Sequence, residues 1–320
     1  MRGTTVSGSS DREEGWEREL VEELAREALK ERRRTRRWNV FFRSLLFLYV
    51  AVLTLLWWRG GDWQGDLTGE HTAVVQIRGL IADGAAANAR DVIKGLKAAF
   101  EDDGTRGVIL RINSPGGSAV QSALVHDEIQ RLRKAHPDVP VVAVVTDAAA
   151  SGAYYIAVAA DEIYANRASI VGSIGVRLDS FGLVGTLHKL GMERRLFTAG
   201  EHKGFLDPFL PLKPDEVAHV KALLESVHQQ FIAAVKAGRG DRLADDPNLF
   251  SGLFWTGEEA KRLGLIDGFA DEATVAREVI GVEKTRDFTH KRDWWERLSD
   301  RIGAALAVRV EERLRSLTLQ

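Results

Sequence analysis

Residues 139–157 read VPVVAVVTDAAASGAYYIA, an apolar run followed by small residues and two tyrosines. The run from Val139 to Val145 has the composition of a buried strand, and Tyr154–Ala160 has a helical pattern. Ser151 therefore falls at a strand-to-helix turn, where small neighbours let a substrate backbone approach its hydroxyl. The free N–H groups at a helix start also suit a developing oxyanion. The turn predicts either a nucleophile or a simple helix N-cap, which serine equally favours.

A second turn, rich in glycine, also joins a strand pattern to a helical one. Gly107–Ile112 resembles a buried strand, Asn113–Gly117 reads NSPGG, and a helical pattern follows over Ala119–Lys134. The paired glycines allow backbone conformations that are closed to other residues, and they leave their N–H groups unobstructed. Such a pair at a helix start can bind a carbonyl oxygen that becomes negative during acyl transfer. Taken alone, an ordinary β-turn explains the same residues.

A serine nucleophile needs a base, and the chain offers histidines and a lysine for that role. Most of the eight histidines lie among charged or polar neighbours, as surface histidines do. Lys203 instead follows a strand-like stretch and precedes the apolar Phe205–Phe209. A lysine between apolar segments can lose part of its hydration, which lowers its pKa and makes it a usable base. Without further context, a lysine is more often a solvated surface charge.

Strand and helix patterns alternate along most of the chain. This alternation predicts an α/β fold with a largely parallel sheet. The strand candidates are Ala73–Ile77, Gly107–Ile112, Val139–Val145, Glu162–Ala165 and Glu193–Phe197. The helix candidates are Asn88–Phe100, Ala119–Lys134, Tyr154–Ala160 and Asp215–Ala237.

Short motifs follow one another between Thr72 and Ala270: Ser114–Gly117, Ala150–Tyr155, Gly172–Val176, Gly200–Lys203, Trp255–Ala260 and Gly264–Asp267. Together and in this order they resemble the signal peptide peptidase family, also called protease IV, of the ClpP/crotonase superfamily. The chain departs from the family pattern at Ala153, where a second glycine is usual. Alanine is small enough that we expect no loss of activity.

The resemblance implies a ClpP/crotonase-like fold of stacked β-β-α units and a role for each of five residues. Ser151 is expected as the nucleophile and Lys203 as the general base of a Ser–Lys dyad, an established variant of the serine triad. Ser173 is expected beside the lysine, orienting it. The backbone N–H groups of Gly117 and Gly152 are expected to form the oxyanion hole. The chain has no internal repeat, and single-copy members must assemble to complete or enclose their sites, so a homo-oligomer is expected.

The resemblance also implies an activity, that of a membrane-anchored serine endopeptidase cleaving hydrophobic peptides such as released signal peptides. Two alternatives remain open at this point. A crotonase-like acyl-CoA enzyme shares the oxyanion-hole turns and needs neither Ser151 nor Lys203. An inactive membrane scaffold would retain the fold without the chemistry.

Composition excludes several other classes of function. The 320-residue chain has a net charge of −2 and a pI near 6.5, which gives no general electrostatic case for nucleic acid as a partner. Cysteine is absent, so disulfides, thiol nucleophiles and thiolate zinc sites are excluded. No metal-ligand cluster, P-loop or dinucleotide fingerprint stands out in the sequence, so we expect neither metal nor cofactor.

The two ends of the chain differ from the predicted protease domain, which we place at residues 72–285. Residues 1–38 form a charged segment with a helical pattern, and residues 59–71 form a polar, glycine-rich linker. Residues 39–58 are predominantly apolar with one charge, Arg43, and a helix of that length spans a bilayer. Residues 286–320 include an amphipathic helical pattern with apolar residues four apart, namely Trp294, Leu298, Ile302 and Leu306.

Charge on either side of the apolar stretch predicts its orientation in a membrane. A run of arginines and one lysine precedes it, and the following flank carries Asp62, Asp66 and Glu70 with only Arg59. Trp57 and Trp58 suit the far interface. The positive-inside rule then places residues 1–38 in the cytosol and the protease domain outside it, on a single-pass protein of the bacterial inner membrane.

Overall fold

The structure is a computed structural model that describes residues 36–55 and 69–290. The chain divides into two units, Met1–Thr68 and Gly69–Gln320. Several expectations fall outside the described residues: nearly all of the charged N-terminal segment, Trp57 and Trp58, most of the linker and the C-terminal amphipathic helix.

The described part of the first unit is one helix, Arg36–Leu55, which is long and apolar enough to cross a membrane. Its 20 residues correspond to about 30 Å, the thickness of a bilayer core. Trp38 lies at the basic end and stacks on Phe42, with ring centroids 5.6 Å apart. The apolar stretch predicted from the sequence is therefore helical over the part that is described.

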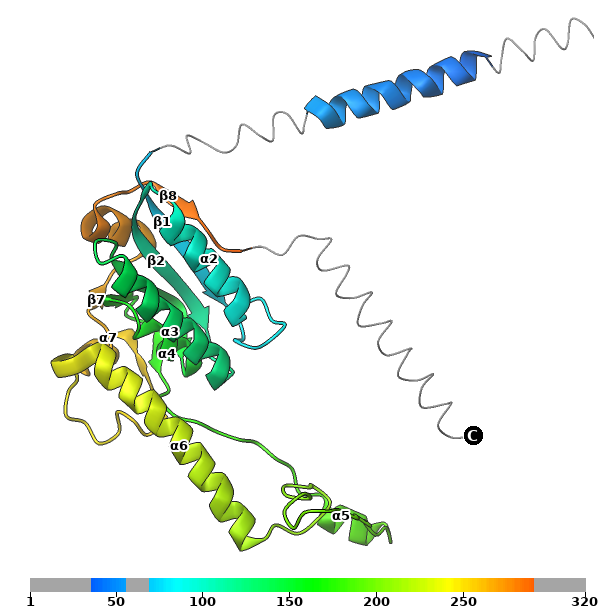
Figure 1. Cartoon of the computed structure of the whole chain (residues 1–320), viewed down its shortest axis with the longest axis vertical. Helices are drawn as coiled ribbons and strands as arrows, with labels where there is room; N and C mark the ends of the chain where they lie inside the picture. Colours follow the sequence, from blue (N-terminus) through cyan, green and yellow to red (C-terminus); the bar gives the residue numbers. More distant parts are fainter. Residues whose placement is uncertain (1–35, 56–68, 291–320) are drawn as a thin grey trace, which may run out of the picture. The chain divides into compact units, whose positions relative to one another are not determined.

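The second unit is built on a mixed, mainly parallel sheet, as predicted (Figure 1). Its main path runs β6-β5-β3-β2-β1-β8, with β4 and β7 branching from β3. Only the pairing of β5 with β6 is antiparallel among the described strands. The strands are β1 His71–Arg78, β2 Thr105–Ser114, β3 Val141–Ala150, β4 Glu162–Ala165, β5 Ile170–Gly172, β6 Phe254–Thr256, β7 Gly268–Phe269 and β8 Thr285–Asp287.

Helices cover one face of this sheet and shorter segments cover part of the other (Figure 1). The alternation of side chains along a strand explains the division. In β2, Leu110 and Ile112 face the large core beneath helices α2, α3 and α4, whereas Ile109 belongs to a smaller cluster with Val275 of η3. The helical segments are α2 Ala89–Glu101, α3 Ala119–Ala135, α4 Gly152–Ala157, α5 Val184–Lys189, α6 Pro214–Arg239, η2 Gly240–Arg242, α7 Gly257–Arg262, α8 Glu272–Thr274 and η3 Val275–Ile280.

Within residues 69–290 the predicted strands and helices are present with one exception. The stretch Glu193–Phe197 was expected as a strand, but it is irregular and exposed. It pairs with no strand, and Arg194 instead forms an ion pair with Asp207 at 3.1 Å. The alternating pattern alone predicted a strand here; a strand also needs a neighbour to pair with, and the sequence does not show one.

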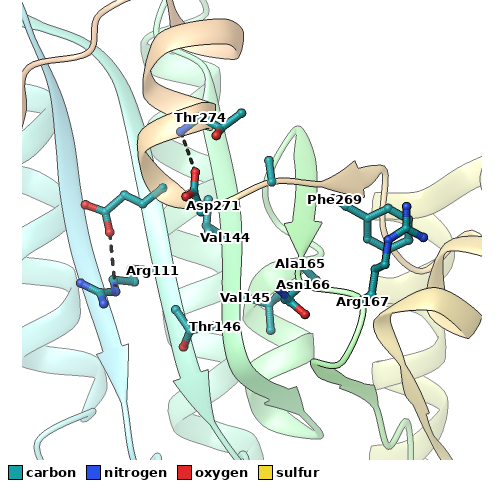
Figure 2. Close-up of a pocket in the computed structure, with 12 residues that line it drawn as sticks. Arg111, Val144, Val145, Thr146, Ala165, Asn166, Arg167, Phe269, Asp271 and Thr274 are labelled. Atoms are coloured by element: carbon teal, nitrogen blue, oxygen red, sulfur yellow. Dashed lines mark hydrogen bonds and ion pairs between the residues drawn. The ribbon is translucent and has the colours of Figure 1, made fainter.

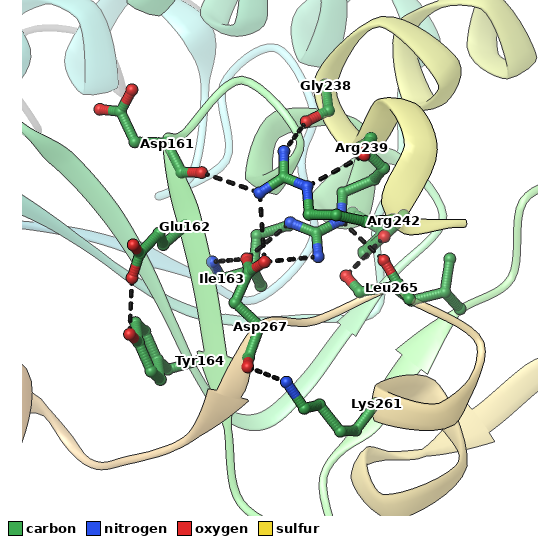
Figure 3. Close-up of polar contacts among 12 residues, drawn as sticks. Asp161, Glu162, Ile163, Tyr164, Gly238, Arg239, Arg242, Lys261, Leu265 and Asp267 are labelled. Atoms are coloured by element: carbon green, nitrogen blue, oxygen red, sulfur yellow. Dashed lines mark hydrogen bonds and ion pairs between the residues drawn. The ribbon is translucent and has the colours of Figure 1, made fainter. Parts of the chain in front are cut away.

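A buried ion pair fixes the C-terminal end of α6 to the sheet (Figure 3). Arg239 is almost fully buried and makes two hydrogen bonds to Asp267, at 2.6 and 2.9 Å. Asp267 also accepts the Ile163 N–H at 2.8 Å, which ties it to β4. Nearby, the Tyr154 hydroxyl donates to the Leu265 carbonyl at 2.7 Å and anchors α4. Burial raises the pKa of the Tyr154 phenol.

Asp267 is the centre of this network. Burial alone would raise its pKa, but the Arg239 hydrogen bonds, the Ile163 N–H and the charges of Arg239 and Arg242 outweigh that effect. The pKa of Asp267 therefore lies below its usual range. The carboxylate stays ionised at neutral pH, and α4 and α6 are both held against the same edge of the sheet.

Asp267→Asn should destabilise the protein by about 3–5 kcal/mol, because it leaves the buried Arg239 without its counter-charge. Thermal unfolding of the purified chain measures the effect, with Asp241→Asn, an exposed carboxylate beyond α6, as the control.

The same pair should show a defined pH dependence. A folded-state pKa below the unfolded value stabilises the fold above about pH 4, and that stabilisation is lost as the pH falls through the folded pKa. The difference in melting temperature between the original chain and Asp267→Asn should therefore narrow below about pH 4. A difference that stays constant from pH 7 to pH 3 would contradict this account.

Candidate active site

Ser151 occupies the turn between β3 and α4 in a backbone conformation that side-chain-bearing residues rarely adopt. Its φ is 53° and its ψ is −124°, and its N–H donates to the Gly172 carbonyl at 2.8 Å. Such strain typically costs 1–3 kcal/mol and persists where the surroundings enforce it. Sharp strand-to-helix turns of this kind expose the hydroxyl of nucleophilic serines in α/β-hydrolases.

The alternative interpretation of Ser151 as a capping residue is wrong. Ser151 does stand at the N-cap position of α4, but its side chain makes no capping hydrogen bond. By contrast, Ser118 at the start of α3 and Asn88 at the start of α2 both cap their helices with their side chains. The Ser151 side chain therefore does not have the local role that most often explains a serine at this position.

The glycine-rich turn lies directly against Ser151. Ile81 makes two backbone hydrogen bonds to this turn. Its N–H donates to the Gly116 carbonyl at 2.9 Å, and its carbonyl accepts the Ser118 N–H at 2.7 Å. Neither bond uses the Gly117 N–H between them. Gly117 has a φ of 151°, and a Cβ there would stand 2.1 Å from the Ile81 carbonyl oxygen. Only glycine fits this position.

The backbones of Gly117 and Gly152, the two glycines that the family resemblance implied for an oxyanion hole, lie close together. The Gly117 nitrogen lies 3.4 Å from the point where a Gly152 Cβ would stand. Gly152 is the first residue of α4, where no carbonyl of the helix can accept its N–H. Two neighbouring backbone N–H donors of this kind can stabilise a tetrahedral oxyanion.

Ser173 follows Gly172 and so lies next to the Ser151 turn. Its φ is 52°, and its N–H donates to the Leu253 carbonyl at 2.8 Å, just before β6. His228 of α6 contacts the next residue, with its Nε2 3.1 Å from the Ile174 carbonyl oxygen. Ser151, Gly152, Gly117 and Ser173 thus lie in one region of the fold.

Lys203 lies in a different part of the chain. It belongs to the irregular segment between α5 and α6, and its side chain is exposed. Nearby Phe197 is 91% exposed. The burial that the sequence suggested for Lys203 is therefore not supplied by its own chain. The Arg194–Asp207 ion pair organises this segment, and the Phe209 N–H and Arg194 hold the pKa of Asp207 below its usual range.

Helix α6 separates Lys203 from Ser151. The lysine segment contacts the start of α6, where His202 lies 4.0 Å from Asp215. Helix α4 contacts α6 much further along, where Tyr155 and Phe231 have ring centroids 5.0 Å apart. At 1.5 Å per residue these two contacts are about 24 Å apart along the helix. Figure 1 shows the same separation, with α5 beside the start of α6 and α4 near its other end. Ser151 and Lys203 of one chain cannot form a hydrogen bond in this arrangement.

A cavity of about 550 Å³ lies on the other face of the sheet (Figure 2). Arg111 of β2, Val144 and Thr146 of β3, and Phe269 of β7 line it, and Arg167 stacks over the Phe269 ring. It contains none of the predicted site residues. Within residues 36–55 and 69–290 no group of acidic or histidine side chains could hold a metal ion.

Comparison with known proteins shows which family this chain belongs to. Residues 133–283 match the model of peptidase family S49, and residues 71–173 match that of Clp protease. A putative protease of Synechocystis is 32% identical over 205 residues, which cover 64% of this chain and 72% of that protein. The chain belongs to peptidase family S49. The predicted resemblance and the ClpP-like α/β fold are therefore confirmed.

Other relatives of this S49 chain share only part of their length with it. A putative signal peptide peptidase of Enterococcus faecium is 29% identical over 209 residues, covering 62% of this chain and 60% of its own. A Na⁺/H⁺ antiporter of Brucella melitensis is 49% identical over 186 residues, covering 58% of this chain. The chain spans only 25% of the antiporter's length, so that protein's name carries no argument about transport.

The residues that hold the site in place were not predicted from the sequence. Ile81, Leu253 and Gly172 act through backbone carbonyl oxygens, which every residue type provides. Buried Ser114 accepts the Gly116 N–H at 3.1 Å through its side chain. Ser114 was visible within the NSPGG turn, and a serine two residues before a glycine pair is the one signal that was available.

Gly117→Ala should lower peptide hydrolysis and active-site labelling by about 100-fold or more, because the new Cβ must displace the Ile81 carbonyl and with it the Gly117 N–H. The measurement is the rate at which a fluorophosphonate labels Ser151.

Gly281→Ala is the matched control, since Gly281 also has a positive φ, 85°, but a Cβ there meets nothing within 4 Å. It should lose some stability and keep its labelling rate. If both variants are labelled at the same rate, the Gly117 N–H does not contribute to an oxyanion hole.

Proposed function

We propose that this chain is a membrane-anchored serine endopeptidase in which Ser151 is the nucleophile and Lys203 the general base. The observation that carries the proposal is the strained turn at Ser151, whose side chain makes no capping bond and which packs against Gly116 of the glycine-rich turn. Membership of peptidase family S49 supports the same reaction. A crotonase-like or scaffold function has no need for this conformation at Ser151.

The reaction follows from these groups. Neutral Lys203 accepts the Ser151 hydroxyl proton while Oγ attacks the scissile carbonyl carbon. The N–H groups of Gly117 and Gly152 stabilise the resulting oxyanion. Lys203 then gives the proton to the leaving amine nitrogen as the C–N bond breaks and an acyl-enzyme forms. Water attacks the ester with Lys203 as base, the serine recovers its proton, and the new carboxylate product leaves. Ser173, beside the nucleophile turn, is the proposed orienting partner of the lysine.

The dyad then needs two copies of the chain. Because α6 keeps Lys203 about 24 Å along its axis from the contact with α4, we assign the base to Lys203 of the partner subunit. Packing against the partner would also supply the burial that a neutral lysine requires and that its own chain does not provide. A head-to-tail contact of this kind, repeated, forms a ring when the rotation between subunits closes.

The surface of the segment that carries Lys203 supports assembly. Large apolar side chains are exposed along it, a degree of exposure that marks interaction surfaces. They include Leu190, Met192, Phe197 and Leu212, and Leu178 and Phe181 are exposed just before α5. A second copy of this chain is the occupant that would also bring Ser151 to the lysine.

Hydrophobic peptides are the proposed substrates. Val120 and Leu124 are exposed at the start of α3, directly after the oxyanion turn, and are 67% and 50% exposed. Apolar substrate side chains would cover this surface. The helix Arg36–Leu55 would hold the site near a membrane, where released signal peptides accumulate. The name of the Enterococcus faecium relative, a putative signal peptide peptidase, is consistent with such substrates.

Mixing two inactive variants tests the shared dyad. Ser151→Ala and Lys203→Ala should each abolish hydrolysis of an apolar reporter peptide. Co-expressed with different tags and purified together, they should recover about a quarter of the original activity, because random pairing reunites an intact serine with an intact lysine at one interface in four.

Other outcomes would reject parts of this assignment. A mixture that stays inactive would place both groups in one chain, and an active Ser151→Ala would reject the nucleophile. Lys203→Arg should be inactive although it keeps the charge, since arginine does not release its proton. His202→Ala should remain active, because His202 contacts Asp215 instead.

Membrane orientation can be tested separately. With Arg36 and Arg37 at the start of the helix, the positive-inside rule places the protease domain outside the cytosol. Protease added to spheroplasts should digest or shift the large domain and spare residues 1–38, as followed with an antibody to each. Full protection of the domain, in spheroplasts shown to be accessible to the protease, would reverse the orientation.

A further inference from the structure

Gly172 is the residue that fixes the Ser151 backbone, and it has an unusual conformation of its own. Its carbonyl accepts the Ser151 N–H at 2.8 Å, and its φ is 102°. It ends β5, and Ser173 with a φ of 52° follows directly. The direction of the Gly172 carbonyl is therefore set at a sharp corner, and any rotation of that peptide would move the nucleophile.

The indole of Trp255 packs against this corner. Trp255 lies in β6, which pairs antiparallel with β5 so that Val171 is opposite Trp255. A Cβ on Gly172 would stand 3.0 Å from Trp255 Cδ1, a contact tighter than most. Two residues earlier, the Leu253 carbonyl accepts the Ser173 N–H at 2.8 Å. The start of β6 thus contacts Gly172 through a side chain and Ser173 through the backbone.

The Trp255 ring contacts Gly172, but its N–H makes no hydrogen bond within the described residues. Its Nε1–H is buried and has no partner among the described residues. Leaving a buried donor unpaired costs about 1–3 kcal/mol, and phenylalanine would avoid that cost. Buried donors without partners are rare in folded proteins and call for an explanation. The contact of the ring with Gly172 provides one.

We propose that Trp255 is a positioning residue for the nucleophile: its ring holds the Gly172 peptide in the orientation that keeps Ser151 in its strained, reactive conformation. The proposal rests on the proposed function, because it requires Ser151 to react. Trp255 touches neither the substrate nor the reacting atoms; it acts through the Gly172 carbonyl. It also gives the tryptophan of the Trp255–Ala260 motif a physical role.

Two substitutions distinguish the contribution of the Trp255 ring from that of its N–H. Trp255→Leu removes the flat ring but keeps β6 apolar, and it should lower kcat and the rate of fluorophosphonate labelling by about 10- to 100-fold with KM little changed. Trp255→Phe keeps a ring over Gly172 and should stay within about threefold of the original in both. Phe254→Leu is the matched control, since Phe254 is the adjacent residue of β6 and is 63% exposed. It should behave as the original chain.

The outcomes distinguish this proposal from the proposed function. If the original chain neither hydrolyses peptide nor takes up the label, the proposed function fails. If the original chain is active and Trp255→Leu matches it in kcat and labelling, the positioning role is overturned. Equal losses in Trp255→Leu and Trp255→Phe, or a loss in KM alone, would also overturn it. Melting temperatures identify a variant that does not fold, and Trp255→Met, which keeps the apolar volume, then replaces the leucine variant.

Discussion

The hydrogen bond from the Ser151 N–H to the Gly172 carbonyl is the interaction on which the rest of the site depends. Ser151 does not adopt a φ of 53° without external support, because an L-residue loses energy there. The support comes from β5, and β5 is in turn fixed between β3 and the antiparallel β6. The parallel sheet and its helices therefore position one peptide group, and that peptide group positions the hydroxyl.

The glycine-rich turn, Asn113–Gly117, is likewise held by backbone hydrogen bonds from a distant part of the chain. Ile81, beyond the end of β1, brackets Gly116 and Gly117 through its backbone, so that the first strand of the sheet reaches the site. Asp267 and Arg239 then hold α6 against the edge formed by β4. Strands and helices that are distant in sequence thus fix the two turns that were recognisable in the sequence, SPGG and ASGAYY.

Residue type and spacing predicted what depends on side chains and local pattern. The buried strands, the helices and both small-residue turns follow from hydrophobic periodicity and from glycine, and the structure has them. Supporting contacts made by carbonyl oxygens, such as those of Gly172 and Leu253, leave no trace in residue identity. Glu193–Phe197 alternates like a strand but has no partner strand, and pairing is a tertiary property. The separation of Ser151 from Lys203 likewise depends on where a 26-residue helix makes its contacts, which its sequence alone does not state.

The length of α6 has a consequence for control of the proposed enzyme. If the proposed dyad is correct, a single chain, which keeps its serine and its lysine far apart along α6, would be inert when alone, however well folded it is. A newly made copy, diluted among other membrane proteins, would be harmless to its neighbours. Turnover would then rise faster than in proportion to the amount of enzyme at low density, since every working centre requires an encounter. Proteolysis would be governed by crowding in the plane of the membrane, with no propeptide or inhibitor required.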